Sequence, residues 1–167
     1  MDIRTAETGD AAAIAAIYNQ GIEERVATFE TEPRGAADIE PWVRDELPLI
    51  VAELDGGVVG WAKLSEYSDR CVYGGVAEVS VYVGREARGR GAGHELVESI
   101  CARADERGLW KVVGLLFPEN EGSVALFRSA GFADVGVFRR HGRLDGEWRD
   151  VLIVERLLGP ARDTESV

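Results

Sequence analysis

The sequence predicts an α/β fold in which helices flank a mixed, mostly antiparallel sheet. Short apolar runs alternate with turn sequences, Asp-Gly pairs join two pairs of these runs as hairpins, and strands alternate with helices only in the middle of the chain. Read in order, the segments give βααβββαβαββ. This pattern is typical of helices packed against a mixed sheet rather than of a doubly wound parallel sheet.

The first half of the chain supplies four strands and two helices. A strand over Asp2 to Glu7 leads into a helix that is capped near Thr8, and a second helix is expected over Ala36 to Glu46. Pro41 should start or bend this second helix. Three apolar, β-prone runs follow, the first two joined by a hairpin turn: Leu49 to Leu54, Val58 to Leu64 and Val76 to Val83.

In the second half, helices and strands alternate before a final hairpin. Apolar residues from Leu96 onward recur at helical spacing up to a stop near Gly108. After this helix we expect a strand, a helix and two strands that turn at an Asp-Gly pair: Lys111 to Phe117, Glu121 to Ala130, Ala133 to about Arg140, and Trp148 to Leu157.

Length and composition predict one globular domain. The chain has 167 residues, of which 46% are hydrophobic and 29% charged, and the sequence shows no internal repeat. We expect the domain to cover residues 1–158 and a flexible tail to follow over residues 159–167.

The charge and the N-terminal segment restrict partners and compartment. A net charge of −11 argues against a nucleic-acid partner, because phosphate contacts need a basic surface. The sequence shows neither an apolar leader nor a run long enough to cross a bilayer, so we expect a cytoplasmic protein without a membrane partner. Cys71 and Cys101 lack metal-ligand spacing, which favours two reduced thiols and no metal site.

A strand, a glycine-rich turn and a helix start form the strongest motif. The strand Val79 to Val83 is followed by Arg88-Gly89-Arg90-Gly91-Ala92-Gly93, which opens the helix that contains Leu96. Unpaired amides in the first helical turn and the helix dipole attract an anion, and the missing Cβ atoms let a pyrophosphate approach the backbone. Arg88 and Arg90 would add charge-assisted hydrogen bonds. Glycines also make ordinary turns, so the pattern alone is a weak indication.

In this position the pattern Arg-x-x-Gly-x-Gly resembles the acetyl-CoA signature of the GNAT acetyltransferases. The resemblance extends over about Ile3 to Leu158 and is greatest to phosphinothricin N-acetyltransferases, in particular to the branch of arsinothricin-resistance acetyltransferases. Beyond the glycine-rich turn it is carried by Ala27-Thr28-Phe29-Glu30, by Tyr73 ahead of Glu78 to Val83, by Asn120-Glu121-Gly122-Ser123, by Ala130-Gly131-Phe132 and by His141 to Val151. It implies a GNAT fold, acetyl-CoA as co-substrate and acetylation of the amino group of a small molecule.

The resemblance assigns the acetyl-CoA contacts to one strand, the glycine-rich turn and a following helix. The positions are Val81, Tyr82, Val83, Arg88, Gly89, Arg90, Gly91, Ala92, Gly93, Asn120 and Ser123. Backbone groups of the strand would hydrogen-bond the amides of the pantetheine arm, and the turn would hold the pyrophosphate. A plain helix cap explains Asn120-x-x-Ser123 equally well, and both explanations can hold at once.

Glu78 matches the general base of the family. Most alkyl amines are protonated at pH 7, so the attacking amine must lose a proton near the thioester. Because side chains alternate along a strand, Glu78, Ser80 and Tyr82 should project to the face opposite Val79 and Val81. From the residues alone, an ion-paired structural glutamate is the commoner explanation. The resemblance favours a base that acts directly or through a water, with a backbone amide near Val81 stabilising the oxyanion.

The sequence departs from the family at Phe127. Relatives carry His or Tyr as a candidate acid in the segment occupied here by Leu126-Phe127-Arg128, and a phenyl ring cannot donate a proton. We expect catalysis without a dedicated general acid, because a thiol with a pKa of about 8.5 leaves as a thiolate with modest help. Of the two histidines, His94 should face phosphate or solvent, whereas His141 should border the substrate pocket or a dimer contact.

The resemblance places Phe29, Glu30, Arg70, Tyr73 and Arg143 on the substrate side. We expect an α-amino acid with a second anionic group, such as phosphinothricin or arsinothricin, or methionine sulfoximine as a near-neutral mimic. Planar guanidinium groups would grip the anion, with Arg70 as the first candidate and Arg143 supplied by the partner subunit of a homodimer. A core position for Phe29 and a solvated loop position for Arg70 are the alternatives.

Two other functions stay open from the sequence. Acetylation of a protein N-terminus, a lysine or a polyamine would use the same cofactor site with a different acceptor groove. A non-catalytic acyl-CoA-binding module would need no base, so Glu78 and the intact glycines weigh against such a module.

Overall fold

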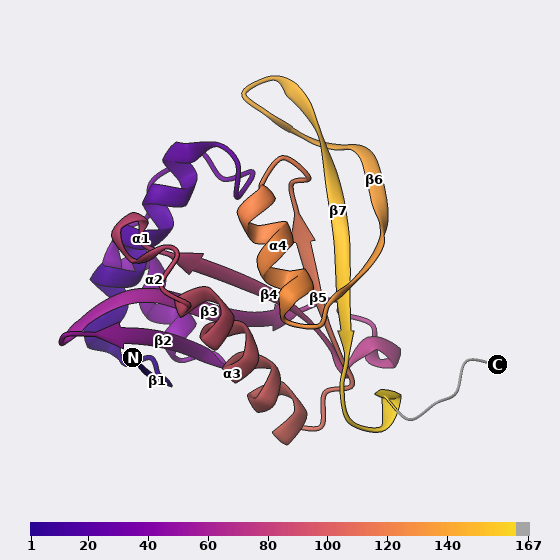
Figure 1. Cartoon of the computed structure of the whole chain (residues 1–167), viewed down its shortest axis with the longest axis horizontal. Helices are drawn as coiled ribbons and strands as arrows, with labels where there is room; N and C mark the ends of the chain where they lie inside the picture. The colour runs from indigo at the N-terminus through magenta and orange to yellow at the C-terminus, as the bar shows by residue number, and fades with distance from the viewer. Residues whose placement is uncertain (163–167) are drawn as a thin grey trace.

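The computed structural model describes residues 1–162, which form a seven-stranded sheet with helices on both faces (Figure 1). The strands are β1 (Asp2–Thr5), β2 (Leu49–Leu54), β3 (Gly57–Glu66), β4 (Val76–Val83), β5 (Lys111–Leu116), β6 (Ala133–Leu144) and β7 (Glu147–Leu157). The helices are α1 (Ala11–Glu24), α2 (Ala36–Val43), α3 (Ala92–Glu106) and α4 (Glu121–Ser129), and short 3-10 turns are η1 (Thr8–Asp10), η2 (Cys71–Tyr73), η3 (Arg85–Ala87) and η4 (Gly159–Arg162). The predicted order βααβββαβαββ and the mixed, mostly antiparallel sheet are confirmed, with strands in the spatial order β1-β2-β3-β4-β5-β7-β6.

Two apolar clusters hold the helices on opposite faces of the sheet. On one face, α3 and α4 bury Leu96 and Phe127 in a cluster with Val112 of β5. On the other face, α1 and α2 pack onto β2 and β3 through a cluster that includes Ile14 and Trp61. The helices α1 and α2 reach only the first half of the sheet, so β6 stays exposed along nearly its whole length.

Two hairpins form at the predicted Asp-Gly turns. Asp55 and Gly56 have φ of 52° and 80°, and Asp145 and Gly146 have φ of 51° and 81°. Two successive residues with positive φ are typical of a type I′ turn, whose twist matches that of the paired strands. The final hairpin is longer than predicted, because β6 runs on to Leu144 through two register shifts against β7.

The strands β4 and β5 run parallel and separate toward their C-terminal ends. They pair only at Val76, Ala77 and Glu78, whereas β4 remains paired with β3 as far as Val83. Figure 1 shows the arrowheads of β4 and β5 pointing in different directions. Beyond Glu78, no strand among residues 1–162 pairs with the β5 side of the β4 backbone. This opening positions the candidate site.

Two local details differ from the expectations. Pro41, expected to start or bend the second helix, lies inside α2, and this helix ends at Val43 rather than at Glu46. Gly159–Arg162 forms η4, with Arg162 hydrogen-bonded to Asp105 at 3.0 Å, and the rest of the expected flexible tail lies outside the described residues. In the part of the chain that the structure describes, no helix is both long and apolar enough to span a membrane.

Candidate active site

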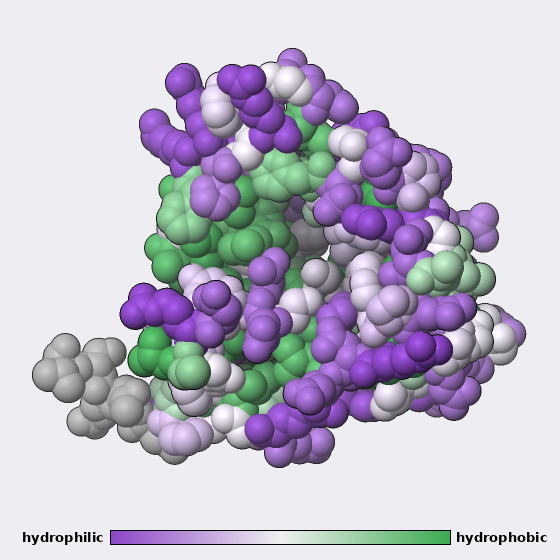
Figure 2. Space-filling model, turned by 180° about the vertical axis from the view of Figure 1, so that it is seen from behind, coloured by the Kyte–Doolittle hydropathy of each residue, from purple (hydrophilic) through white to green (hydrophobic). Residues whose placement is uncertain are grey.

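Two adjoining cavities lie where β4 and β5 separate. The larger cavity, of about 620 Å³, is lined by β3, β4, α1 and the segment after α2, and the smaller cavity, of about 400 Å³, lies between β4 and the start of α3. The residues that line both cavities are Ala27, Val81, Tyr82, Asn120 and Ser123. Figure 2, which views the molecule from behind, shows a hollow near the middle with an apolar surface beside it. The two cavities therefore meet along the C-terminal half of β4.

The glycine-rich start of α3 supplies the largest group of residues that line the smaller cavity. Gly89 and Gly91 have φ of 76° and 87°, a conformation that residues with a Cβ rarely adopt. A Cβ on Gly93 would lie 3.0 Å from the side chain of Leu126, so the start of α3 approaches α4 closely. Gly91 is the N-cap of α3, and the unpaired amides of the first turn and the positive end of the helix dipole lie at this cavity. This arrangement fits a pyrophosphate group.

The two arginines of the glycine-rich turn differ in position. Arg88 lines the smaller cavity, whereas Arg90 is exposed and lines neither cavity, so the structure does not bring Arg90 to the predicted phosphate site. Arg88 donates two hydrogen bonds of 3.0 Å to the carboxylate of Glu24 and one of 3.1 Å to the carbonyl of Val83. A fixed carboxylate therefore offsets part of the charge of Arg88.

Asn120 and Ser123 form a helix cap at the junction of the cavities. The side-chain oxygen of Asn120 accepts a hydrogen bond of 3.2 Å from the amide of Ser123, so Asn120 caps α4. Both residues also line both cavities. The cap and the predicted cofactor contact are thus compatible.

Glu78 lines the larger cavity at the last residue pair that β4 and β5 share. It lies opposite Ser65 of β3. The predicted alternation of side chains is confirmed, because Val79 packs into the core beneath α3 whereas Tyr82 stacks on Trp61 on the other face, with ring centroids 4.8 Å apart.

The Glu78 carboxylate has no salt bridge and no hydrogen-bond partner among residues 1–162. The alternative from the sequence analysis, a structural glutamate in an ion pair, would need a partner that the described part of the chain does not supply. Burial, which disfavours the charged form, raises the pKa of the Glu78 carboxyl above its ordinary value. A carboxylate in such surroundings is a stronger proton acceptor than an exposed one, as a general base requires.

Several residues that the sequence analysis did not assign also line the larger cavity. Tyr18, Trp42 and Trp61 pack together and against the previously assigned Tyr82, with ring centroids 4.8 to 5.8 Å apart. Beside them, three polar side chains line the cavity: Asp45, Lys63 and Ser65. In the register of the sheet, Trp61, Lys63 and Ser65 of β3 lie opposite Tyr82, Ser80 and Glu78 of β4. The pairing register of β3 with β4 is the signal that would have found the three β3 residues.

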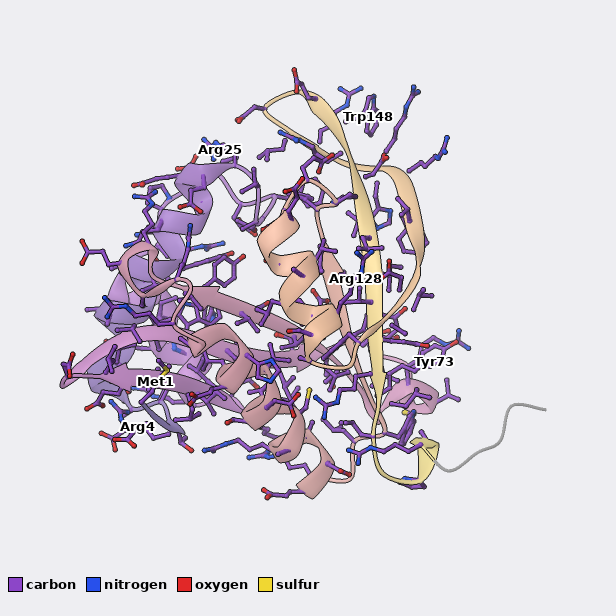
Figure 3. The ribbon with its side chains drawn as sticks, in the orientation of Figure 1. Met1, Arg4, Arg25, Tyr73, Arg128 and Trp148 are labelled. Atoms are coloured by element: carbon purple, nitrogen blue, oxygen red, sulfur yellow. The ribbon has the colours of Figure 1, made fainter. Side chains whose placement is uncertain are left out.

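The predicted substrate residues divide into two groups. Phe29 and Glu30 line the larger cavity, whereas Arg70, Tyr73 and Arg143 line neither cavity. The Arg70 guanidinium lies 5.4 Å from the ring centroid of Tyr73, and Figure 3 shows Tyr73 pointing outward at the end of the molecule where β4 begins. The Arg143 guanidinium lies 4.2 Å from the ring centroid of Trp148 near the tip of the β6–β7 hairpin. Arg70 and Arg143 therefore lie against aromatic side chains outside both cavities.

The structure places Phe127 in the core. Its buried ring packs edge-on against Phe132, with centroids 4.9 Å apart, and has no proton to donate. His141 lines the larger cavity and stacks on Phe138 at 4.6 Å, whereas His94 lines the smaller cavity. Within residues 1–162, no group of three or more His, Cys, Asp and Glu side chains is arranged to hold a metal ion.

Comparison with known proteins relates the chain to acetyltransferases. Residues 14–132 match the model of the acetyltransferase (GNAT) family. One similar protein is a phosphinothricin N-acetyltransferase of Alcaligenes faecalis, 33% identical over 97% of this chain and 84% of its own length. Another is an L-methionine sulfoximine/L-methionine sulfone acetyltransferase of Pseudomonas paraeruginosa, 31% identical over 96% of both chains.

Two similar solved structures share the fold. A GNAT superfamily phosphinothricin acetyltransferase from Sinorhizobium meliloti, in complex with acetyl-CoA, has a TM-score of 0.90 and 29% identity, covering 99% of this chain and 92% of its own. A ribosomal-protein-alanine N-acetyltransferase from Brucella melitensis has a TM-score of 0.91 and 32% identity, covering 95% of this chain and 100% of its own. Since the family match covers well over half of the chain and the glycine-rich start of α3 fits a pyrophosphate, this protein belongs to the GNAT family and is an N-acetyltransferase that uses acetyl-CoA.

Proposed function

We propose that this enzyme transfers the acetyl group of acetyl-CoA to the α-amino group of a small amino-acid-like acceptor, with Glu78 as the general base. The observation that carries the proposal is the half-buried, unpaired carboxylate of Glu78 in the larger cavity, at the point where β4 leaves β5. The names of the two relatives, which act on phosphinothricin and on methionine sulfoximine, support an acceptor of this kind. Arsinothricin belongs to the same class of α-amino acids with a polar head group.

In this proposal, the pyrophosphate of acetyl-CoA binds at Arg88, Gly89 and Gly91 to Gly93, and the pantetheine arm follows Val81 to Val83 into the larger cavity. The acceptor gives a proton to Glu78, directly or through a water, and its neutral amine attacks the thioester carbonyl. A bond forms between the amine nitrogen and the carbonyl carbon, and the carbon–sulfur bond breaks to release the thiolate of CoA. The nitrogen loses its second proton to this thiolate or to water, which leaves the neutral amide. The amide of Val81, on the part of β4 that β5 leaves unpaired, stabilises the developing oxyanion.

The sulfur leaves without a dedicated acid. Phe127 occupies the position of a candidate acid and is buried against Phe132. A thiol of ordinary acidity, with a pKa of about 8.5, leaves as a thiolate at neutral pH with the help of water or a backbone amide. The pH–rate profile should therefore show no alkaline limb caused by deprotonation of a general acid.

Thiol release from acetyl-CoA across a panel of acceptors tests the proposal. The panel contains phosphinothricin, methionine sulfoximine, spermidine and a peptide with an N-terminal alanine, because one structural neighbour is a ribosomal-protein-alanine N-acetyltransferase. We expect the two amino acids to have the highest kcat/KM. Preference for spermidine or the peptide would overturn the proposed acceptor class. Binding of acetyl-CoA without turnover of any acceptor would instead favour a non-catalytic acyl-CoA-binding module.

The homodimer expected from the sequence belongs to this proposal. Leu115 and Phe138 are 38% and 48% exposed on the face of β5, β7 and β6 that α1 and α2 do not cover. The side chain of His141, stacked on Phe138, joins this face to the larger cavity. A second copy covering this face would bury these rings and bring further side chains to the acceptor. Sedimentation equilibrium should give the mass of a dimer; the mass of a single chain would contradict this part.

A further inference from the structure

Lys63 is a cation inside the larger cavity that the established activity leaves without a role. Its residue surface is only 8% exposed, and its ammonium group donates to Asp45 at 2.9 Å, to the Leu64 carbonyl at 3.1 Å and to the Ser65 hydroxyl at 3.4 Å. Burying an ammonium costs free energy unless an anion and hydrogen bonds compensate. A lysine held in this way in a substrate-sized cavity therefore needs an explanation.

The other lysine of the chain provides a comparison. Lys111 on β5 forms an ion pair of 2.7 Å with Glu155, and both side chains of this pair are about equally exposed, at 31% and 30%. In the pair of Lys63 with Asp45, the lysine side chain is 10% exposed whereas the aspartate side chain is 46% exposed. Only Lys63 lines the larger cavity. An anion that enters the larger cavity can therefore reach Lys63 but not Lys111.

The register of the sheet places Lys63 close to the proposed base. Lys63 lies opposite Ser80, and Glu78 is the next residue of β4 on the same face. Such diagonal neighbours in an antiparallel pair are about 7–8 Å apart, within reach of long side chains. An amino acid whose amine lies at Glu78 would therefore present its anionic group toward β3, where Lys63 projects.

Asp45 is a replaceable counter-ion for Lys63. It lies in the segment after α2, is half-exposed, and accepts hydrogen bonds of 2.9 Å from Lys63 and from the backbone amide of Glu46. The bond from Lys63 is the main cause of the lowered pKa of the Asp45 carboxyl. When the Asp45 side chain turns toward solvent, an acceptor oxyanion can take its place on the ammonium group. Trp61, two residues before Lys63 on the same face, adds a buried indole Nε1 that has no hydrogen-bond partner among residues 1–162.

We propose that Lys63 binds the oxyanion of the acceptor, a carboxylate or a phosphinate, in exchange for Asp45, and so sets the preference of the enzyme for acceptors that carry an anionic group. This inference rests on the proposed function, since it deepens the acceptor class of the same cavity. It also supplies the cation that Arg70 and Arg143 do not bring to the cavity of the single chain.

Three variants separate an anion-binding lysine from a structural ion pair. Lys63→Met keeps the length of the side chain and removes its charge, Asp45→Asn removes the competing carboxylate, and Lys111→Met removes the matched lysine outside the cavities. KM and kcat are measured with phosphinothricin and with methionine sulfoximine at saturating acetyl-CoA, and thermal melts confirm that each variant is folded.

Lys63→Met should raise KM for phosphinothricin about 10- to 100-fold, as expected for losing hydrogen bonds between charged groups, with a smaller change in kcat. Asp45→Asn should lower KM or leave it unchanged, because it frees the cation, and Lys111→Met should not alter it. An equal effect of Lys63→Met on methionine sulfoximine assigns Lys63 to the α-carboxylate, and an effect confined to phosphinothricin assigns it to the phosphinate.

A purely structural pair predicts the opposite pattern. Asp45→Asn and Lys63→Met would then raise KM together, or Lys63→Met would match Lys111→Met, and either result overturns the role of Lys63 while the proposed function stands. A wild-type enzyme that acetylates neither amino acid contradicts the proposed function itself.

Discussion

The smaller and the larger cavity meet at β4 but are built in different ways. The largest group of residues that line the smaller cavity comes from one continuous segment, the turn and the first residues of α3, with glycines where side chains would intrude. The others come from α1 and the loop after it, from β4 and from the start of α4. The larger cavity consists of side chains from segments far apart in the chain, including the loop after α1, the segment after α2, β3, β4 and β7. The smaller cavity can therefore hold the donor largely through backbone at the start of α3, whereas the larger cavity can select the acceptor through its side chains.

Replacing the proposed base should have the largest effect of all the changes. This effect should concern catalysis in the larger cavity and not acetyl-CoA binding in the smaller one. Glu78→Gln keeps the shape of the side chain but cannot accept a proton, so kcat should fall about 10²- to 10⁴-fold while the affinity for acetyl-CoA stays the same. Steady-state kinetics and calorimetry measure the two quantities. Glu155→Gln, on β7 outside both cavities, is the control. A normal rate for Glu78→Gln would return Glu78 to a structural role.

A substitution in the glycine-rich turn should affect the smaller cavity alone. Gly91→Val adds a branched side chain where the backbone meets the pyrophosphate, so we expect acetyl-CoA to bind about tenfold more weakly or worse, equivalent to losing one hydrogen bond to a charged group. Gly131→Val is matched to it: Gly131 has φ of 80° against 87° for Gly91, both have open space around an added Cβ, and Gly131 lines neither cavity. Equal affinities in the two variants would show that backbone strain, and not the anion site, causes any loss.

Replacing the two arginines of the turn should change KM for acetyl-CoA by a smaller amount, and only at Arg88. Arg88→Ala should raise KM for acetyl-CoA about two- to fivefold, because Glu24 already offsets part of its exposed charge. Arg90→Ala should leave KM unchanged, since Arg90 lines neither cavity. An effect of Arg90→Ala as large as that of Arg88→Ala would restore the role expected from the sequence.

The smallest expected effect is on stability. The folded-state pKa of Glu78 lies above its unfolded value, so the folded protein holds this proton more tightly and loses stability as pH rises through that interval. Glu78→Gln has no such loss. The Tm of the variant should therefore exceed that of the wild type at neutral pH, and the difference should shrink below about pH 4, where the carboxyl is protonated in both states. A difference independent of pH would mean that packing, not charge, is responsible.

Features that depend on residues close together in the sequence were predicted well. The order of elements, the Asp55-Gly56 and Asp145-Gly146 turns and the glycine-rich turn that opens α3 follow from local patterns, and all are present. The acceptor side was predicted less well. Arg70 matched a substrate position by resemblance but lies over Tyr73 outside the cavities, because an exposed loop and an aromatic neighbour decide where its guanidinium lies.

Lys63 is the opposite case, a residue that lines the larger cavity and that the sequence analysis did not assign to the site. It was visible as one of two lysines, on a strand between apolar neighbours, but its side of the sheet depends on the register of β3 against β4. Its partner Asp45 lies 18 residues away in the chain, at the end of a helix that is shorter than predicted. Contacts of this kind follow from how distant segments pack, which the local patterns do not contain.

The pH dependence of kcat at saturating acceptor, compared between the wild type and Glu78→Gln, tests the central claim most directly. Protonated Glu78 cannot accept the proton of the acceptor, so the wild-type rate should fall as pH is lowered through the pKa of Glu78, which burial raises above the ordinary range of glutamate. The residual rate of the variant should lack this acid limb. The same acid limb in both proteins would contradict the assignment of Glu78 as the general base.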